Sequence, residues 1–135
     1  MLFLDTSALL KRYVDEDGTS TVVAAMAGDR VWVASALARA ETEIVIGRLP
    51  VEGDETAIRQ RRFEEDWDHF RVVPVDMECL RLATFIAAER PVPMLAAIHL
   101  AAAERLPRPF RFLTFDPHRA AAARAMGFDV HGVER

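Results

Sequence analysis

Three carboxylates stand at positions where the sequence predicts chemistry rather than a solvated surface. Asp5 directly follows the short apolar run Leu2–Leu4, and Asp116 follows a second such run, Phe110–Phe115. The carboxyl ends of parallel strands share one edge of a sheet, which is where ligands bind in open α/β folds. Glu41 falls within the apolar stripe of a predicted helix, where an unpartnered carboxylate is rarely tolerated. We therefore expect Asp5, Glu41 and Asp116 to meet at one edge of a sheet.

Such a cluster of acids points to one kind of chemistry. Carboxylates held close together repel one another unless a cation neutralises them. Mg²⁺ takes oxygen ligands, and a metal in such a site activates water and stabilises charge on phosphate oxygens. The pattern therefore indicates phosphoryl transfer or phosphodiester hydrolysis. The plainer alternatives are that Asp5 only caps the helix after it and that Glu41 only pairs with an arginine.

Several neighbouring residues need the same weighing. Thr6 and Ser7, which follow Asp5, are good helix N-cap types. His99 is surrounded by apolar residues, so we interpret it as a buried or positioning histidine rather than a general base. Glu43 points to a different side of its helix from Glu41 and is expected to face solvent. No Cys/His spacing suggests zinc, and no Gly-rich phosphate loop is present.

Apolar runs alternate with helical patterns along the whole chain, which is typical of a parallel sheet with helices on both faces. We predict strands at Leu2–Leu4, Val31–Ala34, Arg71–Val75, Phe110–Phe115 and, at an edge, Phe128–Val130. We predict a short helix after Asp5 that runs to about Leu10–Tyr13. Further helices are predicted at Thr21–Ala27, Ala36–Arg48, Glu55–Phe70, Met77–Arg90, Met94–Arg105 and His118–Met126. Ser35 and Asp76 are the expected N-caps of two of these helices. Apolar periodicity places Ile44, Ile58 and Leu95 on the inner faces of theirs.

Composition narrows the class of protein. The 135 residues are 51% hydrophobic with a net charge of −4, which argues against a basic coat for nucleic acid but not against a nucleic-acid enzyme. The single cysteine, Cys79, has no partner for an internal disulfide and is expected in the core. No apolar run approaches the roughly 20 residues of a membrane span. We therefore expect a single cytoplasmic domain with no membrane association.

Four stretches together resemble the motifs of the PIN-domain family and, within it, the VapC-type ribonuclease toxins of bacterial toxin–antitoxin pairs. They are Leu4–Leu9, Ser35–Leu37 with Glu41, Ala97–Ala101 and Phe112–Asp116. Each motif alone is weak, but their order and spacing agree over nearly the whole chain. The resemblance implies one PIN-like domain over residues 1–135, a three-layer α/β/α fold with a central parallel sheet of four or five short strands.

The resemblance also implies a function. The chain would be an endoribonuclease dependent on Mg²⁺, or on Mn²⁺, that cuts RNA of the tRNA or rRNA class with water as the nucleophile. Catalytic and metal-binding roles would fall to Asp5, Glu41 and Asp116. The hydroxyls of Ser7, Thr6 and Thr114 would orient carboxylates or water. A homodimer and a cognate antitoxin, whose tail covers the active groove, are further implications.

One position departs from the family's pattern. The third motif carries an aspartate just before Ala-Ile-His, and here that position is Ala96. A site with one carboxylate fewer binds a divalent cation less well. Ala96 is either a substitution that silences a toxic nuclease, which we favour, or a natural change. A natural change would leave a weakened enzyme, or one rescued by another acid such as Glu89 or Glu104.

Two other functions compete with a weakened ribonuclease. A catalytically inactive module would keep the fold and still bind antitoxin or RNA. A phosphatase would use Asp5 as nucleophile on a similar turn from strand to helix, but such enzymes usually present a second aspartate two residues later. That residue is Ser7 in this chain, which disfavours the phosphatase.

Overall fold

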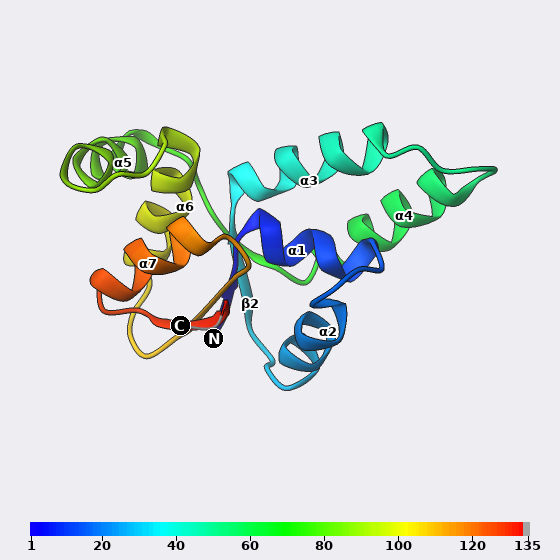
Figure 1. Ribbon diagram of the computed structural model, residues 1–135, viewed down its shortest axis with the longest axis horizontal. Helices are drawn as coiled ribbons and strands as arrows, with labels where there is room; N and C mark the ends of the chain where they lie inside the picture. The colour runs from blue at the N-terminus through cyan, green and yellow to red at the C-terminus, as the bar shows by residue number, and fades with distance from the viewer. Residues whose placement is uncertain (134–135) are drawn as a thin grey trace.

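A computed structural model of the protein describes residues 1–133. Its strands form one parallel sheet in the order β3-β2-β1-β4-β5, with β1 at the centre. Helices cover both faces of this sheet, so the expected three-layer α/β/α architecture is confirmed (Figure 1). The strands are β1 (Leu2–Leu4), β2 (Trp32–Ser35), β3 (Arg71–Val73), β4 (Arg111–Thr114) and β5 (Asp129–Gly132).

The helices fall close to the predicted ranges. They are α1 (Thr6–Tyr13), α2 (Thr19–Ala27), α3 (Ala36–Arg48), α4 (Glu55–Trp67), α5 (Met77–Glu89), α6 (Met94–Glu104) and α7 (Pro117–Ala125). The largest difference is at α4, which ends three residues before the predicted Phe70, and β3 is two residues shorter than predicted. β4 is two residues shorter than predicted, and β5 begins and ends later than the predicted edge strand.

Alternation along β1 divides the core into two halves. Leu2 and Leu4 are fully buried against the side covered by α1 to α4, whereas Phe3 is buried against the side covered by α5 to α7. This follows from the period of two along a strand, which sends successive side chains to opposite faces. Phe3 stacks on Phe112 of the neighbouring β4, with ring centroids 5.3 Å apart. The central strand is therefore packed on both faces, and its carboxyl end is fixed.

Some predicted inner faces are wrong. Ile44, Ile58 and Leu95 are about half exposed, although each was expected to face the core. α3 instead buries Ala38, Thr42 and Ile46, which are four residues apart and turn its inner face away from Ile44. α6 is buried continuously from Ala96 to Ala103, so Leu95 in its first turn is left outside. Cys79 is buried as expected.

Within residues 1–133, no single helix is long and apolar enough to cross a membrane. The pair α5 and α6 reaches that length and composition only together, across a bend of 119°.

β5 closes the sheet beside the carboxyl end of β4, and Gly132 makes this pairing sterically feasible. Gly132 lies opposite Thr114 in the register and has φ of 104°. A Cβ atom at this position would lie 2.2 Å from the Thr114 carbonyl oxygen, far inside contact distance. The absence of a side chain at Gly132 therefore allows β5 to pair closely with the strand that carries Thr114.

We predict that Gly132→Ala destabilises the fold by roughly 1–3 kcal/mol, because a side chain here is both strained and in collision with backbone. Urea unfolding monitored by circular dichroism measures the change. The matched control is Gly47→Ala in α3, where the nearest atom to a new Cβ is 3.9 Å away. The control is expected to be neutral or to stabilise by about 0.5–1 kcal/mol. Equal stability of Gly132→Ala and the wild type would contradict the β4–β5 register.

Candidate active site

Asp5 lies at the turn from β1 into α1 and is fully buried. It is the N-cap of α1, and its Oδ1 accepts a hydrogen bond from the Ala8 backbone N–H at 3.1 Å. Asp5 itself, rather than Thr6 or Ser7, is therefore the capping residue. The capping role and the central position at the sheet edge belong to the same side chain.

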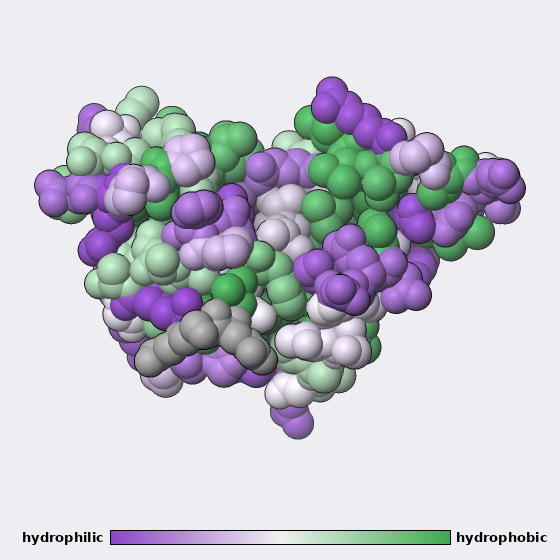
Figure 2. Space-filling view, in the orientation of Figure 1, coloured by the Kyte–Doolittle hydropathy of each residue, from purple (hydrophilic) through white to green (hydrophobic). Residues whose placement is uncertain are grey.

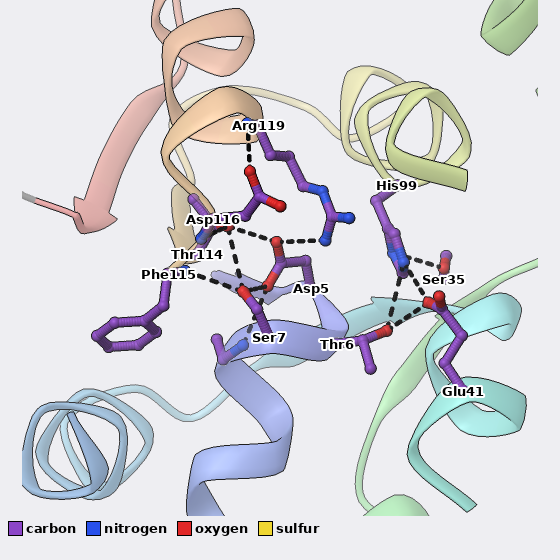
Figure 3. Close-up of polar contacts among 11 residues, drawn as sticks. Asp5, Thr6, Ser7, Ser35, Glu41, His99, Thr114, Phe115, Asp116 and Arg119 are labelled. Carbon is purple, nitrogen blue, oxygen red and sulfur yellow. Dashed lines mark hydrogen bonds and ion pairs between the residues drawn. The ribbon is translucent and has the colours of Figure 1, made fainter. Parts of the chain in front are cut away.

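The carboxylate of Asp5 accepts four hydrogen bonds (Figure 3). Oδ1 accepts from Ser7 Oγ at 2.6 Å and from Ala8 N–H. Oδ2 accepts from Thr114 Oγ1 and from Arg119 Nη1, the latter at 2.7 Å. A carboxylate has about four lone-pair sites in all. The protein's own donors therefore satisfy Asp5 completely.

The two hydroxyls beside Asp5 are oriented by backbone donors. The Phe115 N–H donates to Ser7 Oγ at 2.9 Å, and the Asp116 N–H donates to Thr114 Oγ1 at 3.2 Å. Since each hydroxyl accepts from the backbone, its own proton is directed at Asp5. The Ser7 and Thr114 hydroxyls therefore donate to Asp5 and hold its carboxylate in one orientation.

Asp116 lies on the same edge, at the start of α7. Its Oδ1 accepts from the backbone N–H of Arg119 at 2.9 Å, which makes it the N-cap of that helix. Its backbone contacts Thr114, and the Arg119 side chain reaches from the first turn of α7 to Asp5. Asp5 and Asp116 are therefore neighbours connected through Thr114 and Arg119.

Glu41 belongs to a second network, centred on His99 (Figure 3). Its Oε1 accepts from Thr6 Oγ1 at 2.6 Å and from His99 Nε2 at 2.7 Å. The other ring nitrogen of His99, Nδ1, lies 3.1 Å from Ser35 Oγ. With the ring proton on Nε2, Ser35 donates to Nδ1 and every group in the chain is satisfied.

This network revises three expectations. The buried partner of Glu41 is a histidine rather than an arginine, and the Glu41 side chain is 26% exposed rather than buried within an apolar stripe. The Ser35 hydroxyl bonds to His99 and makes no cap bond to α3. His99 is fully buried, as interpreted from the sequence. Ser35 is fully buried as well, so the Ser-His-Glu order does not present a nucleophile to a substrate.

The surroundings of Glu41 set its charge state. Burial alone would raise the pKa of Glu41, but the hydrogen bonds from His99 and Thr6 outweigh it, and the pKa lies below the usual 4.5. The positive charge of Arg119 lowers the pKa of Glu41 further. Glu41 is therefore ionised at neutral pH, held by Thr6 and His99.

Arg119 is the one site residue that the sequence analysis did not single out. It follows the cap Asp116 by three residues, so the first turn of α7 directs its side chain back to the sheet edge. Its side chain is only 12% exposed, and Asp5 is its only hydrogen-bond partner within residues 1–133. The spacing from a capping aspartate was the available signal.

Ala96 lies beside this edge, where the resembled motif has an acid. It is nearly buried and lines a pocket of about 260 Å³ together with Asp116 and Arg119. Glu89 and Glu104 line a different pocket, and Glu104 pairs with Arg108 at 3.1 Å. Neither therefore stands in for the missing carboxylate.

The residues as arranged do not fit a divalent metal ion. Within residues 1–133, no group of three or more His, Cys, Asp or Glu side chains converges in a way that could hold one. Asp5, the acid at the centre of the edge, already has a guanidinium partner and four hydrogen bonds.

Figure 1 shows the first turns of α1, α3 and α7 meeting at this edge, and Figure 2 shows the surface hollowed between the two helical layers.

Comparison with known proteins gives the fold a family context. The sequence profile described as PIN domain matches residues 2–125. Among solved structures, FitAcB from Neisseria gonorrhoeae has a TM-score of 0.77 at 19% identity, covering 98% of this chain and 97% of that one. A toxin-antitoxin complex from Klebsiella pneumoniae has a TM-score of 0.71 at 15% identity, covering 98% and 97%.

A more distant similarity is to VapBC2 from Rickettsia felis, bound to a DNA fragment from its promoter. Its TM-score is 0.67 at 10% identity, and the match covers 99% of this chain and 100% of that one. At such identities, likeness to a structure establishes the fold alone. No curated protein sequence matches this chain at a significant level.

The lowered pKa of Glu41 predicts a pH-dependent stability. A glutamate with a depressed folded-state pKa stabilises the fold in full above its unfolded value, and that contribution is lost as the pH falls through the folded value. We expect Glu41→Gln to cost about 1 kcal/mol at pH 7, because a neutral amide accepts the same two bonds more weakly. Below about pH 4.5 the difference from wild type should shrink. Urea titrations at pH 7, 5 and 3.5 measure it, and a difference that stays constant over this range would refute the assignment.

Proposed function

The chain belongs to the PIN-domain family, and on that premise we propose that it is the toxin-type protein of a toxin–antitoxin pair, with a ribonuclease site weakened by Ala96. The observation that supports the proposal is that Asp5, Glu41 and Asp116 each lie close to Arg119. Asp5 accepts a hydrogen bond from its side chain, Asp116 accepts one from its backbone, and the Arg119 charge lowers the pKa of Glu41. Arg119 also lines the pocket at the position of the missing acid. Helix capping uses only one oxygen of Asp5 and one of Asp116, and Glu41 lies inside α3 and caps no helix.

The proposed roles follow from contacts within the chain. Asp5, Glu41 and Asp116 are the acids of the proposed phosphodiester-cleaving site. Ser7 and Thr114 hold the Asp5 carboxylate in one orientation, and Thr6 holds Glu41 together with His99. Mg²⁺ or Mn²⁺ is the cofactor expected from the resemblance, and the arrangement in this chain does not fit it. We therefore assign weak cleavage at most to the chain as it stands.

Partners are proposed on the same footing. A cognate antitoxin is supported by the similarity in fold to the toxin-antitoxin complex from Klebsiella pneumoniae. RNA of the tRNA or rRNA class as substrate, a homodimer, a cytoplasmic location and a single PIN-like domain over residues 1–135 rest on the resemblance of the motifs.

A second candidate function is an inactive module that binds antitoxin or RNA without cutting it. The observation in its favour is the Asp5 carboxylate, which has no lone pair left for another ligand. RNA binding that is indifferent to divalent ions and to Asp5→Asn would favour this candidate. Binding or cleavage that needs both would favour the ribonuclease.

We predict that Ala96→Asp combined with Arg119→Gln raises Mn²⁺-dependent cleavage of single-stranded RNA at least about tenfold over the wild type. Ala96→Asp alone is measured beside it. The physical reason is that the change restores a carboxylate beside Asp116, and even the outer partners of metal ligands change activity 10–100-fold. The pocket beside Ala96 has room for the longer side chain. A fluorogenic RNA measures the initial rate.

The matched control adds Asp5→Asn to each active variant, which should return cleavage to background, as should EDTA. If neither Ala96→Asp nor its combination with Arg119→Gln cleaved RNA above the wild-type level, the weakened-ribonuclease proposal would be abandoned in favour of the binding module.

A further inference from the structure

The ion pair between Arg119 and Asp5 places a cation at the centre of the acidic edge. We infer that the Arg119 guanidinium is a built-in counter-cation that takes the place of a divalent ion at Asp5 and closes this edge to metal. The inference rests on the proposed function, since it concerns why the acids of a ribonuclease-like site do not gather around a metal here. It assigns a role to a residue outside the acidic set.

The hydrogen bonding of Asp5 is the first support. Three of its four bonds come from Ser7, Ala8 and Thr114, whose positions are fixed by the turn into α1 and by the end of β4. The fourth comes from Arg119 Nη1. Arg119 is therefore the only one of the four donors on a flexible side chain. A metal ion could reach Asp5 only by displacing it.

The burial of the pair is the second support. Asp5 is fully buried and the Arg119 side chain is 12% exposed, so the attraction between them is little screened by water. Arg119 Nε is also buried and without a hydrogen-bond partner within residues 1–133. The guanidinium thus forgoes a bond at Nε while it holds Asp5. An arginine committed in this way does not swing out to meet a phosphate.

The neighbouring Ala96 is the third support. Ala96 and Arg119 line the same pocket, so the missing carboxylate and the added cation lie side by side. Both make the edge less negative than a site with an acid at position 96 and no cation at position 119. Charge repulsion among Asp5, Glu41 and Asp116 is what a divalent ion would relieve. The positive charge of Arg119 already offsets much of this repulsion.

The test replaces the charged Arg119 by a neutral residue and measures whether the protein then binds manganese. We expect the thermal midpoint of the wild type to move by less than about 1 °C between EDTA and MnCl₂. The thermal midpoint of Arg119→Gln should rise by about 4 °C when the manganese concentration is about tenfold above the dissociation constant of manganese from this variant. Arg119→Lys keeps a cation beside Asp5 and should behave like the wild type. Adding Asp5→Asn to Arg119→Gln should abolish the response, and manganese binding followed by electron paramagnetic resonance should agree.

If Arg119→Gln does not fold in EDTA, recovery of folded protein on adding MnCl₂ reports the same binding, and no recovery overturns the inference. An equal response of the wild type and Arg119→Gln to MnCl₂ also overturns it. These outcomes are separate from RNA cleavage. A manganese response without cleavage in any variant would leave the counter-cation standing and remove the ribonuclease proposal. Cleavage by Ala96→Asp without a manganese response in Arg119→Gln would do the reverse.

Discussion

The buried carboxylate of Asp5 is the constraint on which the rest of the site depends. An ionised group removed from water must be paired and hydrogen-bonded, and breaking such a pair costs about 3–5 kcal/mol. Three elements supply the four donors: the start of α1 supplies Ser7 and Ala8, the end of β4 supplies Thr114, and the first turn of α7 supplies Arg119. The parallel pairing of β1 with β4 brings these donors together, and Gly132, opposite Thr114, lets β5 pair with β4. Fold stability and site chemistry are thus joined at one side chain.

Glu41 is organised by a separate chain of hydrogen bonds through His99 to Ser35. Thr6, which is adjacent to Asp5 in the chain, and the charge of Arg119 link the two networks. Each acid therefore has its own partners from the protein. In a metal site, the acids would instead share one cation. The same edge can accordingly be viewed as a ribonuclease-like constellation in which internal partners have replaced the shared ion. This view explains why the family's fold and motif order are retained while the charge balance of the site has changed.

Much of this could be predicted from the sequence because the signals were local. The short apolar runs that end on Asp5 and near Asp116 fixed the strands and the shared edge, and the single departure at Ala96 was visible within its motif. The parts that failed depend on tertiary packing. The period of apolar residues in α3 suggested a face through Ile44, whereas packing on α1 and α4 selected the face through Ala38 and Ile46. The spacing from Asp116 could place Arg119 in the first turn of a helix, but it could not give the partner of Arg119, because Asp5 lies 114 positions away along the chain.

The most direct measurement of the central claim is a crystal structure of the wild-type protein grown in MnCl₂, with diffraction data collected at the manganese absorption edge. The account predicts that Arg119 Nη1 lies within hydrogen-bond distance of Asp5 Oδ2 and that no anomalous peak lies among Asp5, Glu41 and Asp116. A manganese peak between these acids, with the Arg119 side chain turned away from Asp5, would contradict it.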